Sequence, residues 1–166
     1  MTRRTVLSAL GVAATAGVAG VGTATATRQQ ALEPTHTVEV PGTQEVTIAD
    51  DGVHAFVAAG DGIVVVDTDA GEVVARRREL LADRESGPIS SYADCVYNDG
   101  VLALAGRING PGDALNGIVV FDVSDPTSPT QQRFIPTDHG IHNAAVSGTT
   151  VYATAAGIAP DSPIIA

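Results

Sequence analysis

Lysine and tryptophan are absent from the 166 residues of this chain, and Cys95 is its only cysteine. A single cysteine excludes an internal disulfide, and its place in the strand-like stretch YADCVYNDG favours a buried, unreactive thiol. Three tyrosines and three phenylalanines provide few rings on which sugars or bases could stack. The sequence therefore argues against a disulfide scaffold and against a carbohydrate or RNA stacking site.

The charge of the chain is strongly one-sided, because 19 Asp and Glu residues stand against nine arginines and give a net charge of −10. Nucleic acids and anionic membranes would repel such a surface, so neither is expected as a partner. An acidic surface without lysine, combined with many small residues, resembles the proteins of extreme halophiles. On that resemblance, concentrated salt screens the repulsion between carboxylates, and the fold is expected to weaken when salt is removed.

Residues 1–26 have the features of an export signal. Arg3 and Arg4 precede an apolar run rich in alanine, valine and glycine, and this pattern resembles the twin-arginine signal. Small residues at its end predict cleavage after Ala26. Removing 26 of 166 residues leaves 140 and changes the net charge from −10 to −12, because two arginines are lost. The mature chain is expected to be exported, extracellular or attached to the cell surface, without a membrane span. An uncleaved N-terminal anchor is the alternative.

Three glycines divide the remaining sequence at a constant spacing of 48 residues: Gly52, Gly100 and Gly148. Each follows one alternating or apolar run and precedes another, which is the pattern of a β-hairpin with a tight turn. After the first two hairpins, GIVVVDT and GIVVFDV predict a buried third strand, and EVVARRR and PTQQRFIP predict a fourth. Four antiparallel strands in about 40 to 50 residues make the blade of a β-propeller. The predicted fold class is therefore all-β, with β-propeller-type four-stranded blades.

The repeat divides the mature chain into four parts. Residues 42–88 form the first blade, residues 89–136 the second, and residues 137–166 an incomplete third, in which no GIVV strand is recognisable. Residues 27–41 form a lone strand of the kind that completes the last blade of a closed propeller. About two and a half blades are thus expected, whereas closure takes about four to eight. The chain is expected to be a truncated piece of a longer parent, or to complete a ring as a homo-oligomer.

The stretch GIVVFDVSDPTSP, residues 117–129, resembles the repeat of the LVIVD family, whose propeller-forming repeats are common in exported bacterial and archaeal proteins. HNAAVSGTTVYAT, residues 142–154, resembles the hairpin that opens the unit. Residues 62–71 keep the apolar strand but not the family's Val-Ser-Asp-Pro turn. The likeness covers most of residues 37–157 and implies the propeller fold. It implies little about activity, because most members have no assigned chemistry.

The segment DHGIHN gathers side chains of the kinds that bind metals, namely Asp138, His139 and His142. Imidazole and carboxylate are ordinary ligands of zinc, copper or iron. Counting six residues back from the turn glycines places Asp94 at the position equivalent to His142, so both are expected to face one channel. These four residues are the candidate ligands of a divalent metal. The alternative is that they cap turns or bind backbone carbonyls at the entrance of the blade.

Two aspartates of the sequence DVSDP, Asp122 and Asp125, are interpreted as turn residues whose carboxylates bind backbone amides, in preference to a calcium site. The sequence contains no Ser/His/Asp order, no glycine-rich phosphate loop and no cysteine spacing typical of a metal site. A complete catalytic set is therefore not evident.

Three functions remain open at this point. The first is an exported, non-catalytic propeller that acts as a binding or interaction module for a protein or a small-molecule ligand. The second is a fragment of a metal-dependent propeller enzyme, in which Asp94 and His142 are joined by ligands on other blades. The third is a truncated product without function, which would expose a blade face and a sheet edge.

Overall fold

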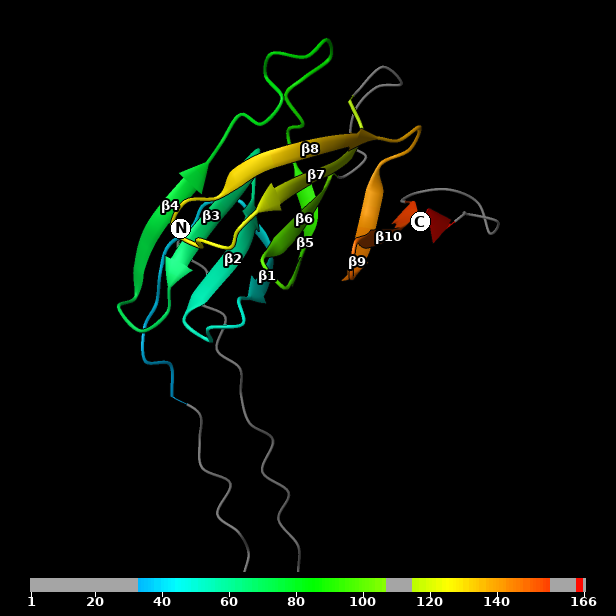
Figure 1. Cartoon of the computed structure of the whole chain (residues 1–166). Helices are drawn as coiled ribbons and strands as arrows, with labels where there is room; N and C mark the ends of the chain where they lie inside the picture. The colour runs from blue at the N-terminus through cyan, green and yellow to red at the C-terminus, as the bar shows by residue number, and fades with distance from the viewer. Residues whose placement is uncertain (1–32, 107–114, 156–163, 166) are drawn as a thin grey trace, which may run out of the picture. The chain divides into compact units, whose positions relative to one another are not determined.

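The structure, a computed structural model, describes residues 33–106, 115–155 and 164–165. All regular structure in this part of the chain is β-strand, and the strands form antiparallel sheets (Figure 1). The predicted all-β class, with four-stranded antiparallel units, is confirmed. In the same residues, no helix is long and apolar enough to cross a membrane. The predicted export signal, with its arginine pair and its cleavage site, lies outside the residues described.

The first sheet has the strand order β1-β2-β3-β4, so each strand pairs with its neighbour in sequence. Its strands are β1 (Thr43–Ile48), β2 (His54–Ala59), β3 (Gly62–Asp67) and β4 (Glu72–Arg77). β2 and β3 lie in the middle of the sheet, and almost all of their side chains are buried. This explains why GIVVVDT reads as a continuous apolar run, because a strand that is covered on both faces needs no polar side.

The second sheet repeats this order as β5-β6-β7-β8. Its strands are β5 (Tyr92–Asn98), β6 (Val101–Gly106), β7 (Gly117–Asp122) and β8 (Thr130–Pro136). In the turn after β7, Asp122 Oδ1 accepts a hydrogen bond from the Ser124 amide, and Asp125 Oδ1 accepts one from the Thr127 amide, both at 3.0 Å. The prediction that these carboxylates bind turn amides is confirmed. The Ser124 hydroxyl and amide bonds also lower the pKa of Asp122.

The third sheet has the order β11-β10-β9. Its strands are β9 (Ile141–Ser147), β10 (Thr150–Ala155) and β11 (Ile164–Ile165). β11 pairs with β10 as β3 pairs with β2 and β7 with β6, which places a third strand where the sequence predicted none. The strand was missed because Ile164 and Ile165 lack the Gly-Ile-Val-Val pattern that marks β3 and β7.

The lone strand predicted over residues 27–41 does not form in residues 33–41, and the rest of that range lies outside the described residues. Val38 and Val40 instead pack against the face of the first sheet that is turned away from the second sheet. We call this face the outer face of the first sheet. The segment contributes side-chain contacts to this face, and none of its described residues pairs with a strand.

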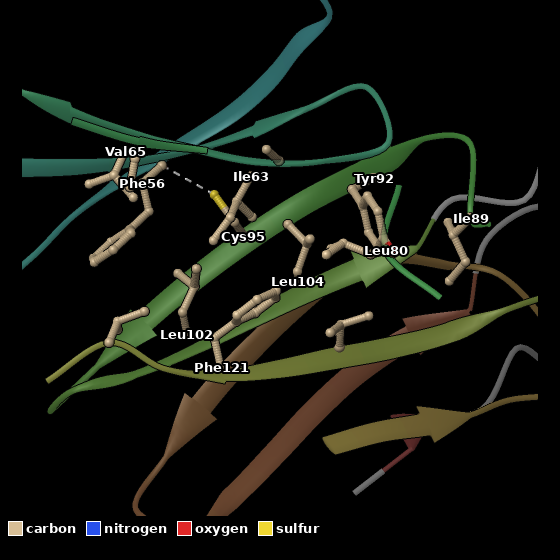
Figure 2. Packing of buried hydrophobic residues seen from close by; sticks show 14 of the residues in the cluster. Phe56, Ile63, Val65, Leu80, Ile89, Tyr92, Cys95, Leu102, Leu104 and Phe121 are labelled. Atoms are coloured by element: carbon tan, nitrogen blue, oxygen red, sulfur yellow. Dashed lines mark hydrogen bonds between the residues drawn. The ribbon is translucent and has the colours of Figure 1, made fainter. Parts of the chain in front are cut away.

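The first interface, between the first and second sheets, is filled by large side chains. Phe56 of β2 packs with Leu102, Leu104 and Phe121 of the second sheet, and each of the four is at most 1% exposed. Figure 2 shows them around Cys95, whose thiol donates a hydrogen bond to the Phe56 carbonyl at 3.4 Å. Burying one such side chain contributes about 1.5–3 kcal/mol. This interface is therefore the main apolar core.

The second interface, between the second and third sheets, is built from smaller side chains. Ala103, Ala105 and Ile118 of the second sheet pack with Ile141 and Ala153 of the third. All five are at most 3% exposed, so the contact excludes water although its side chains are short. The second interface therefore provides a smaller apolar core than the first.

Candidate functional site

Asp94 is the only buried charged side chain in the described part of the chain, with 6% of its surface exposed. Its Oδ2 atom accepts a hydrogen bond from the Ala144 amide at 2.7 Å, which joins β5 to β9 across the second interface. A bond between a carboxylate and a backbone amide is stronger than one between neutral groups. Asp94 therefore fastens the third sheet to the second through its Oδ2 atom.

Rows of residues that face one another across the strands show which positions are equivalent in the three sheets. The rows are Glu45–Ala58–Ile63, Asp94–Ala105–Ile118 and Asn143–Thr154–Ile164. Asp94 is thus equivalent to Asn143, and the prediction that it is equivalent to His142 was wrong by one residue. The turn glycines misled the count, because Gly100 is the second residue of its two-residue turn and Gly148 is the first. A shift of one residue turns a side chain to the opposite face of a strand.

The three other predicted metal ligands are exposed. His142 lies on β9, where its Nδ1 shares a hydrogen bond with Asn143 Oδ1. Asp138 and His139 lie in the connection between β8 and β9, and the Thr137 hydroxyl donates to the His139 carbonyl. Within the described ranges, no group of three or more His, Cys, Asp or Glu side chains is placed to hold a metal ion. The His142 side chain thus bonds to its neighbour Asn143, whereas the contact at His139 involves only its backbone carbonyl.

Cys95 is buried in the first interface, as the sequence predicted. Burial raises the pKa of its thiol to about 12, and the nearby carboxylates Asp94 and Glu45 act in the same direction. The thiol therefore stays protonated at neutral pH, and a protonated thiol is a poor nucleophile. Its hydrogen bond to Phe56 gives it a packing role.

Asp51, in the connection between β1 and β2, has a lowered pKa, as Asp122 does. Asp51 Oδ1 accepts hydrogen bonds from the amides of Val53 at 2.8 Å and His54 at 2.9 Å, and Oδ2 contacts His54 Nδ1 at 2.6 Å. These bonds to His54 and Val53 lower the pKa of Asp51 to about 2. Asp51 therefore shapes the turn through these bonds.

A groove of about 630 Å³ lies beside the second interface, between strands β6–β8 and the β9–β10 hairpin. Its apolar walls come from both sheets, and its polar residues lie on β8 or just after it, in the hairpin turn and at the start of β10. The apolar residues are Val101, Ile118, Val120, Ile135, Val146 and Val151, and the polar ones are Gln132, Arg133, Thr137, Thr149 and Thr150. A concave, mostly apolar space with a few polar groups is typical of a small-molecule site. The sequence analysis did not identify it.

Arg133 is the only charged side chain among the described residues that line the groove. It lies on β8 directly opposite Val120 and is exposed, and no ion pair joins it to another residue described in the structure. Its guanidinium group therefore places a positive charge at an apolar surface. The sequence signal was present in PTQQRFIP, where an arginine stands two residues before an isoleucine on the same strand. Its significance depends on the position of the third sheet, which the sequence does not give.

Comparisons with protein-family models, with curated proteins and with solved structures found no match to this chain.

Proposed function

We propose that this chain is an exported, non-catalytic repeat protein of β-propeller-type blades that acts outside the cell as a binding module. Its ligand is held in the groove between the second sheet and the β9–β10 hairpin. The ligand class that fits is a small molecule with an apolar body and one anionic group. The LVIVD-like stretch at residues 117–129 and the twin-arginine pattern motivate the fold and the location.

The blade arrangement is supported by the way in which the sheets follow one another. The first and second sheets have the same strand order, and each packs a face against the next sheet in sequence. Their first strands lie side by side, with β1 next to β5 and β5 next to β9. Propeller blades are four-stranded sheets that pack radially in this manner, because a single small sheet cannot bury its own faces.

The groove is the observation that carries the proposal of binding. Ile118, Val120 and Ile135 line its second-sheet wall, and Val146 and Val151 line the wall formed by the hairpin. Apolar walls of this kind favour the apolar body of a ligand through removal of surface from water. A ligand that fills the groove would therefore gain contacts with two sheets at once.

Arg133 provides the basis for the anionic group of the ligand. A guanidinium group binds carboxylates, sulfonates or phosphates through paired N–H donors, which gives direction as well as attraction. The net charge of −10 repels anions at long range, but salt screens that repulsion beyond about 10 Å at 0.1 M ionic strength. The local attraction at Arg133 is short-range and is less affected.

A fluorescent anion with an apolar body, 8-anilinonaphthalene-1-sulfonate, tests this proposal with the full chain in concentrated salt. We expect saturable binding with one dye per chain. Arg133→Gln is expected to raise the dissociation constant about tenfold, because one charge-assisted contact is lost. Val120→Trp is expected to abolish binding by filling the groove. Arg76→Gln, which removes an exposed arginine on β4, serves as the matched control and should leave binding unchanged.

Binding that does not saturate, or that is equal in the parent, Arg133→Gln and Val120→Trp, would contradict the assignment of the groove. Circular dichroism of each variant separates a lost site from a lost fold.

A further inference from the structure

The outer face of the first sheet exposes two large apolar side chains. Val46 and Ile48 lie on β1, and 52% and 50% of their surfaces are exposed. They pair with Val57 and Ala55, whose side chains belong to the cluster on that outer face. The segment with Val38 packs on the same cluster and leaves Val46 and Ile48 uncovered.

The equivalent side chains in the other two sheets are covered by the sheet that precedes them. Cys95 and Tyr97 correspond to Val46 and Ile48 in the second sheet, and both pack in the first interface. Ala144 and Val146 correspond to them in the third sheet, and both pack in the second interface. These positions on the first strand of a sheet are therefore covered in the second and third sheets and exposed in the first.

The opposite end of the stack is the face of the third sheet turned away from the second, which we call the outer face of the third sheet. Tyr152 lies on it with 44% of its surface exposed, and it pairs with Ala145. Asn143, two residues from Ala145 on β9, lies on the same face and is exposed. The same face of the second sheet carries Asp94, which binds the amide of the next sheet.

The hydrogen bond of Asp94 can be repeated between two copies of the chain. Asn143 is the residue equivalent to Asp94, and Val46 is equivalent to Ala144, the residue that donates the amide. Asn143 Oδ1 now contacts His142, and the Val46 amide donates to Glu45 Oε1 at 3.1 Å. Both are exposed contacts between neighbours in sequence, so an amide and an acceptor from another copy can replace them at little cost.

We propose that the outer face of the first sheet of one copy packs on the outer face of the third sheet of a second copy, head to tail. Val46 and Ile48 of the first copy would lie against Tyr152 of the second copy. Asn143 of the second copy would accept a hydrogen bond from the Val46 amide of the first. The interaction continues the contact that already joins the second sheet to the third. None of these four side chains is charged, although the chain has 19 acidic residues. The two patches can therefore meet without burying a carboxylate, once the exposed Glu45 side chain, which now binds the Val46 amide, turns to solvent.

A head-to-tail contact uses two different surfaces, so each copy can bind one neighbour on each side. Two substitutions that block opposite surfaces therefore make a decisive pair. Val46→Asp blocks the first-sheet surface, and Tyr152→Asp blocks the third-sheet surface. Both positions are exposed, so neither substitution is expected to unfold the chain.

Molar mass is measured by light scattering after size exclusion, with the full chain and with the chain lacking residues 1–26, in concentrated salt. The parent is expected to be larger than a monomer, and each single variant is expected to raise the dissociation constant by more than about tenfold. A mixture of the two variants should form a dimer and nothing larger, because each supplies the surface that the other retains. Val74→Asp, on the strand at the far edge of the first sheet, is the control and should associate like the parent.

A parent chain that is monomeric at all concentrations would overturn the proposal, and so would an equal mixture of the two variants that stays monomeric. Equal loss of association in Val74→Asp would also overturn it, because the effect would then come from charge alone. The dye-binding test of the groove uses different residues, so either proposal can fail without the other.

Discussion

The two interfaces between sheets differ in side-chain size, although the backbones that form them repeat. The first contains phenylalanines and leucines, and the second contains alanines and a buried carboxylate. Strand β6 faces both, with Leu102 and Leu104 toward the first and Ala103 and Ala105 toward the second. β6 therefore helps to fill the first interface with large side chains, whereas its alanines leave room for the groove beside the second interface. Between sheets of the same strand order, a groove can thus arise from a change of side-chain size without a new loop or domain.

Phe56→Ala is the substitution expected to have the largest effect on this contrast. Phe56 is fully buried and stacks on Tyr97, with 5.6 Å between ring centroids. Removal of the ring is expected to lower the free energy of unfolding by about 3–5 kcal/mol, measured by urea titration. Val74→Ala, which shortens an exposed side chain on β4, is the control and should cost less than about 0.5 kcal/mol. Equal losses in the two variants would show that the first interface is not the main core.

Asp94→Ala tests the contact that fastens the third sheet. The Ala144 amide loses its acceptor at 2.7 Å, and the free energy of unfolding is expected to fall by about 1.5–3 kcal/mol. Hydrogen exchange at the Ala144 amide should accelerate, whereas exchange in β2 should not change. Asp94→Asn keeps an acceptor of similar size and is expected to recover part of the loss. If Asp94→Ala leaves the Ala144 exchange rate unchanged, the carboxylate does not join the sheets.

Val119 and Val120 allow the two interfaces to be compared at adjacent residues of β7. Val119 is fully buried in the first interface, whereas Val120 is partly buried and lines the groove. Val119→Phe is expected to lower the free energy of unfolding by about 1–3 kcal/mol, because the packed side lacks space for the larger ring. Val120→Phe should change it by less than about 0.5 kcal/mol, since the groove accepts the ring. Similar losses at both positions would contradict an open second interface.

The smallest expected effect is the pH dependence contributed by Asp51. Its pKa is lowered from 3.8 to about 2 in the folded chain, so its contribution to stability is present above pH 3.8 and is lost as the pH falls through about 2. Because the carboxylate is exposed, the contribution should stay below about 1 kcal/mol. The difference in stability between the parent and Asp51→Asn should therefore shrink between pH 4 and pH 2. A difference that is constant across this range would show that the carboxylate charge contributes nothing.

The strand pattern could be predicted from the sequence because it depends on local alternation and turn residues. The hairpins and the two runs that begin at Gly62 and Gly117 are found as predicted strands, and Asp122 makes its predicted turn bonds. The prediction missed β11, a strand of two residues, Ile164 and Ile165, that forms by pairing with β10. Such pairing depends on a distant segment, which a local pattern does not contain.

The relation between the candidate site residues was harder to predict. The sequence suggested that Asp94 and His142 share one position, because equal glycine spacing concealed a one-residue difference between two turns. The register of the strands depends on cross-strand pairs, and these pairs make Asn143, not His142, the residue of the third sheet equivalent to Asp94. The groove at Arg133 was not predicted, since it requires the position of the third sheet against β8.

Amide hydrogen exchange, measured strand by strand in the full chain, tests most directly whether the two interfaces differ as their side chains indicate. The large core of the first interface predicts that amides in β2, β3, β6 and β7 exchange only with global unfolding, at one common free energy. The small side chains and the single Asp94 contact predict that β9 and β10 open at a lower free energy, and that Asp94→Ala lowers it further. One free energy of exchange shared by all these strands would contradict the account, because the third sheet would then be held as firmly as the first two.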